Sequence, residues 1–463
     1  MSAQVDSVAK AAAAAFRGYA SGPAPLRAKF LREIAAGIED LGTALVDCVQ
    51  RETTLPAPRI EGERARTCMQ LRLFADIAEC DTWPDERVDV ADSVRNPPRP
   101  QLRSRLRPLG PAVVFAASNF PLAFSVAGGD TAAALAVGCP VIVKAHPAHP
   151  QTSMMVAQVI HAAAADCGLP AGVFALVSGD GIDSGVALVQ HPAIKVAAFT
   201  GSQQGGLALW RIAQQREDPI PFFAEMGSIN PVFVFPGALA SESDAIATGL
   251  HASMTLGVGQ FCTQPGVIFV LDDTAGRAFV DKLSTLVAGT PRGSMLSPTI
   301  CSNYQRAVAR RGGEHGVRVL ARVEGLSSER IAGAVLFATD AATFIAHPDL
   351  AEEIFGPSSV LVTCSSTQDF LRCAQVLHGQ LTATIWSAAN ENDADLLWEL
   401  EQKAGRIVFN GFPTGVEVGT ATMHGGPFPA TTDSRFTSVG ARALDRFVRP
   451  VAWQTPAPRE SIG

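Results

Sequence analysis

Two apolar runs, PAVVFAA at residues 111–117 and PVIVK at residues 140–144, decide the fold class of this chain. Both are short and lack polar alternation, which is typical of strands buried on both faces of a sheet. Apolar helices are expected after them, over residues 121–137 and 152–165. This alternation of strand and helix predicts a parallel sheet that is covered by helices on both faces.

The same alternation extends over two lobes. In the first lobe, further strands are expected at residues 173–177, 194–199 and 221–224, with helices at 184–189 and 203–214. A second α/β series begins near Asn230, with strands expected at 231–235, 266–271, 335–338, 359–362 and 381–386 and helices at 243–256, 276–287, 367–377 and 393–403. Outside these series, residues 59–78 read as helix, the Pro- and Arg-rich residues 83–108 as an excursion, and residues 442–453 as a candidate last strand.

Composition excludes several classes of protein. The chain has 463 residues, of which 47% are hydrophobic and 17% charged, and its net charge is −7, so we expect a folded protein without a nucleic-acid partner. No apolar run reaches the ~18 residues that span a bilayer, so no membrane association is expected. The nine cysteines are scattered and contain no C-x-x-C, which favours free thiols in a reducing cytoplasm.

Short polar segments follow the ends of several predicted strands. Ligands of a parallel sheet bind outside the carboxyl ends of its strands. The residues concerned are Asn119 after 111–117, Lys144 in 140–144, Gly201-Ser202 after 194–199, Glu225 after 221–224, Cys262 between a helix and a strand of the second lobe, and Glu353. We therefore expect these side chains to line one crevice.

Taken in order, these segments resemble the aldehyde dehydrogenase superfamily over nearly the whole chain. The segments NFPLAFSVAGGDTAAALAVGCPVIVKAHPAHP, GRIVFNGFPTGVEV and HGGPFPATTDSRFTSVGARALDRFVRPV are similar to the group that contains NADP-type aldehyde dehydrogenases and 2,5-dioxovalerate (α-ketoglutaric semialdehyde) dehydrogenases. Members usually carry a further strand pair before the first helix, and this sequence begins after the expected place of that pair.

The resemblance implies an aldehyde dehydrogenase-like α/β fold with a Rossmann-like cofactor-binding lobe at residues 1–226 and a catalytic lobe at 227–430. A small β oligomerisation element is implied for residues 431–463, with 95–108 as a candidate part of it. A homodimer or homotetramer is expected.

Cys262 is the candidate nucleophile. A thiolate that adds to an aldehyde gives a tetrahedral adduct, which can expel hydride to a nicotinamide and leave a thioester. Gly257, Gly259 and the polar Thr263-Gln264 favour an exposed turn at Cys262. For the other eight cysteines a buried structural role is the better interpretation.

The resemblance implies that Asn119 and the backbone N–H of Cys262 bind the oxyanion, although a helix N-cap before Phe120 is an alternative for Asn119. Glu225 resembles the family's general base for thioester hydrolysis. Because the segment FFAEMG is otherwise apolar, we expect a raised pKa for Glu225, and a solvated strand-end carboxylate is the alternative.

Cofactor binding is expected in the first lobe, although no G-x-G-x-x-G follows the first strand. Gly179-Asp180-Gly181 reads as an ordinary turn. Gly201-Ser202 and the following helix N-terminus are the candidate pyrophosphate site, with a plain turn capped by Ser202 as the alternative. The resemblance further implies that Lys144 contacts the adenosine ribose and Glu353 the nicotinamide ribose, with Phe355 packed nearby.

Cofactor choice is expected to favour NADP, with NAD as the alternative. NAD-specific members carry an acidic residue three positions after the matching lysine, where this chain has Pro147, and no carboxylate occurs between Lys144 and Gln151. The nearby His146 and His149 could favour a 2′-phosphate. They are spaced i and i+3 without a third ligand, so no metal is expected.

The resemblance implies oxidation of 2,5-dioxovalerate to 2-oxoglutarate. Arg435 is the first candidate anchor for the substrate carboxylate, and a surface or interface arginine is the alternative. Other readings are a fatty or general aldehyde dehydrogenase, an acylating enzyme that uses coenzyme A, a cofactor-independent cysteine hydrolase and a catalytically idle scaffold. Glu225 argues against the acylating enzyme, Gly201-Ser202 and Lys144 against the hydrolase, and the trio of Asn119, Glu225 and Cys262 against the scaffold.

Overall fold

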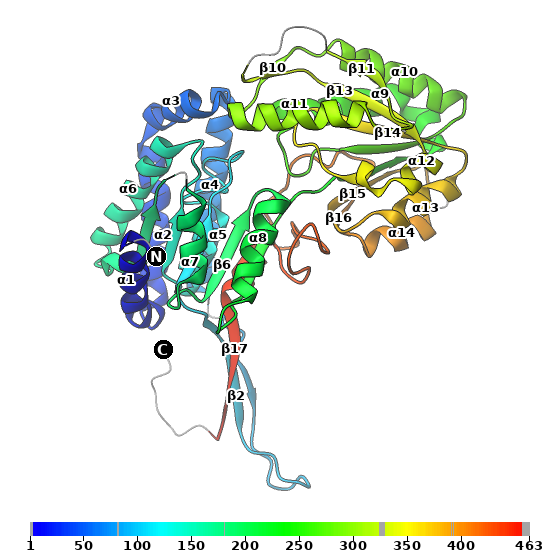
Figure 1. Ribbon diagram of the computed structural model, residues 1–463. Coiled ribbons are helices and arrows are strands. Elements are labelled where there is room, and N and C mark those ends of the chain that lie inside the picture. Colours follow the sequence, from blue (N-terminus) through cyan, green and yellow to red (C-terminus); the bar gives the residue numbers. More distant parts are fainter. Residues whose placement is uncertain are drawn as a thin grey trace.

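The computed structural model describes residues 3–80, 83–179, 181–323, 329–389, 391 and 393–455. Two α/β lobes lie side by side, and a β arm projects from beneath the first lobe (Figure 1). The predicted α/β class with two lobes and a small β element is therefore confirmed. No helix among the described residues has the length and apolarity needed to cross a bilayer.

The first lobe is built on a parallel five-stranded sheet with the order β5-β4-β3-β6-β7. Alternate residues of the central strand face opposite sides: Val113 packs with α1, α7 and α8, whereas Val114 packs with α2, α4, α5 and α6. Both faces are apolar because both are covered, as the unbroken apolar runs predicted. The strands are β3 (Ala112–Phe115), β4 (Val141–Lys144), β5 (Phe174–Val177), β6 (Val196–Thr200) and β7 (Phe222–Glu225). The helices are α1 (Ala3–Ala20), α2 (Ala24–Asp40), α3 (Gly42–Thr53), α4 (Ala57–Glu79), α5 (Gly129–Val137), α6 (Pro150–Asp166), η1 (Ala171–Val173), α7 (Ile182–Gln190) and α8 (Gln203–Gln214).

The second lobe contains a seven-stranded sheet with the order β11-β13-β14-β9-β8-β15-β16, parallel except for the edge strand β11. Its two faces form separate cores, one around Phe233 and Phe269 and one around Val232 and Val270. The strands are β8 (Val232–Val234), β9 (Val267–Leu271), β10 (Gly293–Ser294), β11 (Arg318–Arg322), β12 (Ile331–Ala332), β13 (Val335–Asp340), β14 (Ser358–Cys364), β15 (Gln380–Trp386) and β16 (Ala404–Phe409). The helices are α9 (Pro236–Thr255), η2 (Leu256–Gly259), α10 (Thr274–Ala288), α11 (Pro298–Gly312), α12 (Ala341–Ala346), η3 (Pro348–Ala351), α13 (Thr367–Val376) and α14 (Ala394–Glu401).

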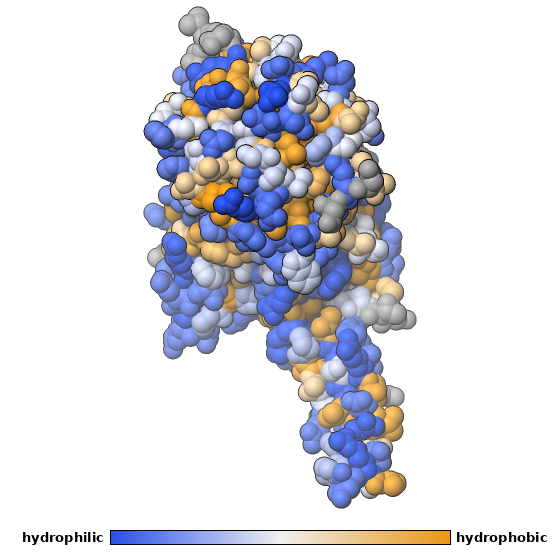
Figure 2. Space-filling view, turned by 90° about the vertical axis from the view of Figure 1, so that its right-hand side faces the viewer, coloured by the Kyte–Doolittle hydropathy of each residue, from blue (hydrophilic) through white to orange (hydrophobic). Residues whose placement is uncertain are grey.

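The arm is a three-stranded antiparallel sheet of β1 (Arg87–Asp89), β2 (Leu102–Pro108) and β17 (Val448–Gln454). The excursion at residues 83–108 is thus a β hairpin. The candidate last strand at 442–453 begins later than expected, because η4 (Ala441–Phe447) precedes β17. Apolar side chains lie on the surface of the arm, among them Val88, Val90 and Val94 (Figure 2).

The helix predicted for residues 121–137 is too long, because α5 begins only at Gly129. Residues 120–128 form a compact turn, in which the N–H groups of Leu122 and Ala123 donate to the carboxylate of Glu63 at 2.8 and 2.9 Å. Gly128 approaches the carbonyl of Ala123 so closely that a Cβ would lie 2.5 Å from its oxygen. The turn therefore depends on a distant carboxylate, which local apolarity does not reveal.

Candidate active site

Cys262 lies on the loop between η2 and β9, and this loop contacts Asn119 of the first lobe. Three consecutive residues of η2, Gly257, Val258 and Gly259, have positive φ angles of 56°, 59° and 66°. A Cβ on Gly259 would lie 2.3 Å from the carbonyl carbon of Gly356, so a glycine is required for this approach. The tight loop thereby brings Cys262 close to the segment that precedes β14.

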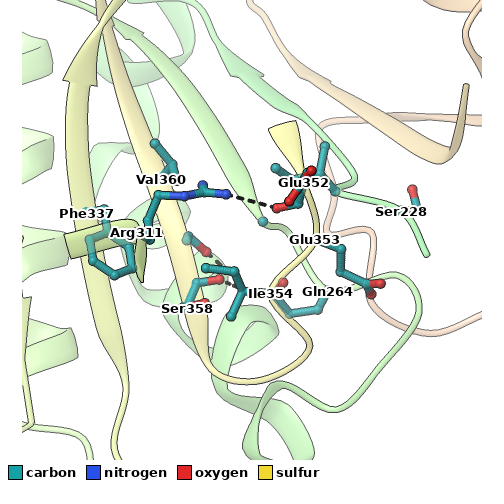
Figure 3. A pocket seen from close by; sticks show the side chains of 12 residues that line it. Ser228, Gln264, Arg311, Phe337, Glu352, Glu353, Ile354, Ser358 and Val360 are labelled. Atoms are coloured by element: carbon teal, nitrogen blue, oxygen red, sulfur yellow. Dashed lines mark hydrogen bonds between the residues drawn. The ribbon is translucent and has the colours of Figure 1, made fainter. Parts of the chain in front are cut away.

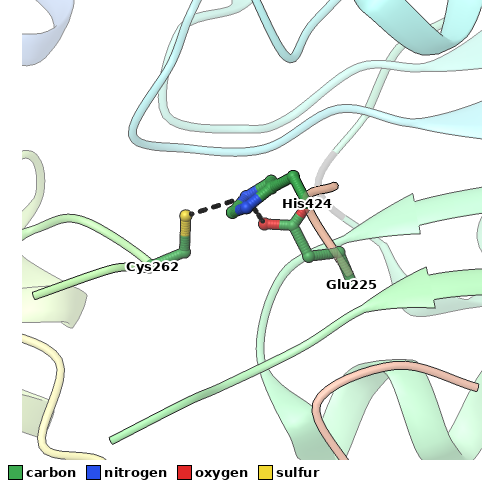
Figure 4. A group of neighbouring side chains, drawn as sticks. All are labelled: Glu225, Cys262 and His424. Carbon is green, nitrogen blue, oxygen red and sulfur yellow. Dashed lines mark hydrogen bonds and ion pairs between the residues drawn. The ribbon is translucent and has the colours of Figure 1, made fainter. Parts of the chain in front are cut away.

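Cys262, His424 and Glu225 form a compact cluster, although they are far apart in the sequence (Figure 4). The Nε2 atom of His424 lies 2.8 Å from Oε1 of Glu225 and 3.4 Å from Sγ of Cys262. The hydroxyl of Ser438 donates to Oε2 of Glu225 at 2.5 Å. Glu225 and His424 are both buried, so the alternative of a solvated carboxylate at the end of β7 is wrong.

The prediction that Glu225 has a raised pKa is also wrong. Burial raises the pKa of this carboxyl group, but the charge and hydrogen bond of His424, with hydrogen bonds from Ser438 and Cys262, outweigh burial and lower it. Hydrogen bonds donated to a carboxylate favour its charged form. Glu225 is therefore ionised near neutral pH despite its burial.

The pKa of the Cys262 thiol is shifted in the opposite direction. Burial, together with the nearby charges of Glu225 and Glu353, raises the pKa of Cys262 well above its usual value. The resting sulfur is therefore protonated, and it hydrogen-bonds the carboxylate of Glu225. This arrangement can transfer the thiol proton to Glu225 when an electrophile arrives.

Asn119 faces this cluster from the first lobe. Its Nδ2 atom donates to the carbonyl of Gln260 at 3.1 Å, two residues before Cys262. The alternative of a helix N-cap is wrong, because the next helix after Asn119 begins only at Gly129. On the opposite side, Asn230 donates to the carbonyl of Cys262 at 2.8 Å and fixes the backbone of the nucleophile loop.

The predicted cofactor residues Lys144, Gly201 and Ser202 lie at the carboxyl ends of β4 and β6. The N–H of Gly201 donates to the carbonyl of Glu225 at 3.1 Å, which ties this turn to the catalytic strand β7. Ser202 caps α8 by accepting from the N–H of Gly205 at 3.3 Å, and residues 201–204 are exposed. An exposed helix N-terminus of this kind suits the pyrophosphate of a dinucleotide.

Lys144 and the two nearby histidines have more local partners than expected. Nζ of Lys144 donates to the carbonyls of Gly179 at 2.6 Å and Ala145 at 3.0 Å. Asp180, in the predicted turn after Gly179, lies outside the described residues.

Burial lowers the pKa of His146 to about 3 and also lowers that of His149, so both are neutral near pH 7. The expectation that they attract a 2′-phosphate by charge is therefore wrong.

Glu353 lies on the turn between η3 and β14, beside the catalytic loop. Figure 3 shows the guanidinium of Arg311 directed at this turn, while the carboxylate of Glu353 points away from it. Arg311 donates to the carbonyls of Leu350, Asp349 and Glu352, so a buried arginine fixes the backbone that carries Glu353. Burial raises the pKa of Glu353 to about 8. Phe355, two residues later, is half-buried.

Comparisons with known proteins agree with this geometry. Residues 1–429 match the sequence profile of the Aldehyde dehydrogenase family. The chain belongs to the aldehyde dehydrogenase family. It is similar to "Alpha-ketoglutaric semialdehyde dehydrogenase 2" of Azospirillum brasilense, with 48% identity over 98% of this chain and 87% of that protein. It is also similar to an alpha-ketoglutaric semialdehyde dehydrogenase of Acinetobacter baylyi, with 45% identity over 97% of this chain and 86% of that protein.

Solved structures share the fold at lower identity. A 1-pyrroline-5-carboxylate dehydrogenase has a TM-score of 0.82 at 22% identity and covers 98% of this chain and 85% of its own. The NAD+ complex of an aldehyde dehydrogenase from Bacillus cereus also has a TM-score of 0.82 at 22% identity, over 97% of this chain and 88% of its own. Enzymes of this family oxidise aldehydes with NAD(P), so this chain is an oxidoreductase.

His424 is the site residue of this aldehyde dehydrogenase that sequence analysis missed. It contacts Glu225, which lies 199 positions earlier, and its Nδ1 atom is buried without a hydrogen-bond partner among the described residues. The hydroxyl of Thr437 accepts from its N–H at 2.9 Å and fixes its backbone. A histidine that opens the segment HGGPFPATT was the available signal, but no spacing linked it to Glu225 or Cys262.

Arg435 lies apart from this cluster. Its side chain is 79% exposed, and its guanidinium donates twice to Asp433, at 2.9 and 2.6 Å. It lines a surface hollow together with Arg442 and Thr422. An exposed guanidinium that pairs with a carboxylate two positions away is typical of a surface arginine.

Proposed function

We propose that this enzyme oxidises 2,5-dioxovalerate to 2-oxoglutarate through a thioester on Cys262. The observation that carries the proposal is the buried contact among Cys262, Glu225 and His424, which joins a protonated nucleophile to an ionised base. The identities of 48% and 45% to alpha-ketoglutaric semialdehyde dehydrogenases support this substrate.

The chemistry begins at the Cys262 thiol. Glu225 takes the S–H proton while sulfur forms a bond to the aldehyde carbon, and the carbonyl oxygen becomes an oxyanion. The second N–H of the Asn119 amide and the backbone N–H of Cys262 donate to that oxyanion; one such donor contributes roughly 3 kcal/mol in comparable sites. A nicotinamide cofactor bound at this site would supply the acceptor for the hydride of the tetrahedral carbon. After Glu225 has released the thiol proton to solvent, it removes a proton from the water that attacks the thioester carbonyl. The Cys262 thiolate then leaves and takes up a proton, which restores the thiol.

His424 acts in this scheme as a positioning residue. Its Nε2–H donates to Glu225, which keeps the carboxylate ionised and aimed at the sulfur. Ser438 adds a second donor on the other carboxylate oxygen. Together they allow a fully buried glutamate to serve as a base near neutral pH.

The cofactor proposed for this chain is NADP, with NAD as the alternative. Residues 1–226 form the proposed cofactor-binding lobe and residues 227–430 the catalytic lobe. Gly201 and Ser202 would hold the pyrophosphate, Lys144 the adenosine ribose, and Glu353, with Phe355 beside it, the nicotinamide ribose. The support for NADP is Pro147, at the position where a carboxylate would repel a 2′-phosphate.

A homodimer or homotetramer is proposed, with residues 95–108 and 431–463 in the oligomerisation element; residues 456–463 lie outside the described residues. The support is the arm, which carries apolar side chains on its surface (Figure 2), with Val90 and Val94 69% and 94% exposed. Among the described residues, its outer strands β1 and β17 each pair only with β2. Such a surface favours association. All nine cysteines are free, which supports the cytoplasm as the location.

The test is a steady-state screen of aldehydes with NADP and with NAD. We expect 2,5-dioxovalerate to have the highest kcat/KM and NADP to be preferred. Cys262→Ala should abolish oxidation and retain cofactor binding. A wild type that prefers long uncharged aldehydes would overturn the substrate proposal in favour of a fatty aldehyde dehydrogenase, and reduction of cofactor by Cys262→Ala would overturn the mechanism.

A further inference from the structure

One face of helix α4 lies over the catalytic loops. Arg59, Glu63 and Arg66 are spaced i, i+4 and i+7, so their side chains leave the helix on the same side. Glu63 accepts the N–H groups of Leu122 and Ala123 in the turn after Asn119. This face therefore contacts the segment that carries the proposed oxyanion donor.

Arg59 extends the contact to the nucleophile loop. It pairs with Glu63 at 2.9 Å, and its guanidinium lies 4.4 Å from the ring centre of Phe120 and 5.5 Å from that of Phe261. Phe261 directly precedes Cys262. Arg59 and Glu63 are therefore fully occupied by contacts with the turn after Asn119 and with the loop before Cys262.

Arg66 lies one turn further along α4, and only one edge of its guanidinium group is hydrogen-bonded to described residues. Its Nη1 atom donates to the carbonyl of Val416 at 2.5 Å. Its Nε atom is buried and has no hydrogen-bond partner among the described residues. Nε and Nη2 form the edge of a guanidinium that binds a carboxylate through two parallel hydrogen bonds, and this edge of Arg66 is open.

The loop that meets Arg66 is held against Cys262. Arg406 donates to the carbonyls of Pro413 and Gly415, at 2.5 and 2.8 Å, and its buried Nε also has no partner among the described residues. The N–H of Gly415 donates to the hydroxyl of Thr263, next to Cys262, at 3.3 Å. A negative charge on the Cys262 sulfur would raise the pKa of both Arg66 and Arg406, so the two guanidinium groups lie near the nucleophile.

The positive charge of Arg66 has no carboxylate partner within salt-bridge distance in the described part of the chain. Glu63 is bound by Arg59, and Glu417 is exposed and accepts the N–H of the neighbouring Val418 at 3.2 Å. The charges of Glu417 and Glu63 act on Arg66 from a distance, but neither carboxylate binds its guanidinium, and a buried N–H without an acceptor calls for an explanation. An anionic ligand that reaches this position would supply that acceptor.

We infer that Arg66 binds the distal carboxylate of an aldehyde substrate through its open Nε and Nη2 edge, with Arg406 contributing further positive charge. This inference rests on the proposed function, because it assigns the carboxylate of a short dioxo acid to a residue of the same site. It replaces Arg435 as the anchor, since the guanidinium of Arg435 is exposed and already bound to Asp433.

The test compares an acidic and an uncharged aldehyde of equal length, 2,5-dioxovalerate and pentanal. Arg66→Met keeps most of the side-chain volume and removes the charge, so kcat/KM for dioxovalerate should fall about 100-fold, chiefly through KM, while pentanal changes less than about threefold. Arg66→Lys restores the charge without the two-donor edge and should recover part of the loss. Arg64→Met is the matched control on the same helix, because Arg64 donates away from the site to the carbonyl of Gly42.

Equal losses on both aldehydes in Arg66→Met would overturn the inference, as would a selective loss for dioxovalerate in Arg435→Met. A second measurement separates this inference from the substrate proposal. Calorimetric binding of 2-oxoglutarate to Cys262→Ala should weaken about 100-fold when Arg66→Met is added. If wild type oxidises dioxovalerate poorly while 2-oxoglutarate binding still depends on Arg66, the substrate proposal fails and the carboxylate site stands. Unchanged binding in the double variant overturns the site.

Discussion

Two carboxylates near Cys262, Glu225 and Glu353, have pKa values that are shifted in opposite directions. Glu225, at the end of β7, has a lowered pKa. Glu353, on the turn before β14, has a pKa of about 8. Burial acts on both groups in the same direction, and the difference comes from their partners: Glu225 is bonded by His424 and Ser438, whereas no ion pair or hydrogen bond reaches the Glu353 carboxylate among the described residues.

The comparison shows how one crevice can hold both a charged base and a neutral acid near pH 7. A carboxylate that accepts two or three hydrogen bonds stays ionised in an apolar setting, and one without them takes up a proton. We infer that the partners of Glu225 decide its role in the reaction, and that removing them would turn Glu225 into a group like Glu353.

The variant His424→Asn should reduce the difference between the pKa values of Glu225 and Glu353 most strongly. Without the imidazole, burial raises the pKa of Glu225, so less of the base is ionised at pH 7 and kcat should fall by roughly 100-fold. Because a raised pKa shifts ionisation to higher pH, part of the activity should return as the pH increases. The pH profile of kcat checks this; a uniform loss at all pH values would mean that His424 only supports the local structure.

Ser438→Ala should give the same effect at a smaller size. The serine donates one hydrogen bond to a charged group, and such a bond contributes from about 1.5 kcal/mol upward. Because His424 remains bonded to Glu225, we expect the lower end, roughly a tenfold loss of kcat at pH 7, with a smaller upward shift of the acidic limb. The neighbouring Thr437→Ser is the control, because it retains the hydroxyl that accepts from the His424 N–H. An unchanged profile in Ser438→Ala would leave His424 as the decisive partner.

Glu353→Gln should change the pH dependence of stability. The folded-state pKa of Glu353 is raised to about 8, so its neutral form favours the folded state; that stability is fully present below the unfolded pKa and is lost as the pH rises towards 8. The amide cannot ionise, so the Tm of the variant should gain on wild type between pH 5 and pH 8, by the equivalent of about 1 kcal/mol after allowance for solvent screening. A constant Tm difference across this range would contradict the raised pKa.

Treatment with a metal chelator should have no effect on the activity of the enzyme. Ligand atoms of Glu225, Cys262 and His424 lie within 4.8 Å of one another, a spacing that could hold a metal ion. They are, however, already bonded to each other, with His424 donating directly to Glu225. Activity should therefore survive prolonged treatment with EDTA. Loss of activity that zinc restores would make this cluster a metal centre instead of a base–nucleophile pair.

The sequence predicted the five strands of the first sheet and the five inner strands of the second, because their apolar runs reflect burial on both faces and need no knowledge of distant partners. It missed the edge strands β11 and β16, which are less buried. Val113 and Val114 face different cores, yet both are apolar. The turn at residues 120–128 was missed because its backbone is bonded to Glu63, some 60 positions earlier. Helix α11 was also missed: it begins at Pro298, capped by Ser297, and carries a polar, arginine-rich surface that breaks the apolar pattern.

The residues of the site were predicted through family resemblance, and their ionisation was not. Apolar neighbours of Glu225 indicated burial, and burial alone gives the wrong direction of the pKa. The deciding partners, His424 and Ser438, come from a loop about 200 positions later, so local composition carries no information about them. Arg66 was overlooked for the same reason, since its surroundings come from helix α4 and the loop at Val416.

The most direct test of the central claim is a rapid-mixing experiment with Glu225→Gln. If Cys262 forms a thioester that Glu225 then hydrolyses through an activated water, this variant should still release a burst of reduced cofactor of about one equivalent per site, followed by turnover reduced by roughly 100- to 10,000-fold. Glu225→Gln/Cys262→Ala should show no burst. Steady turnover of Glu225→Gln at the wild-type rate would contradict the assignment of Glu225 as the base.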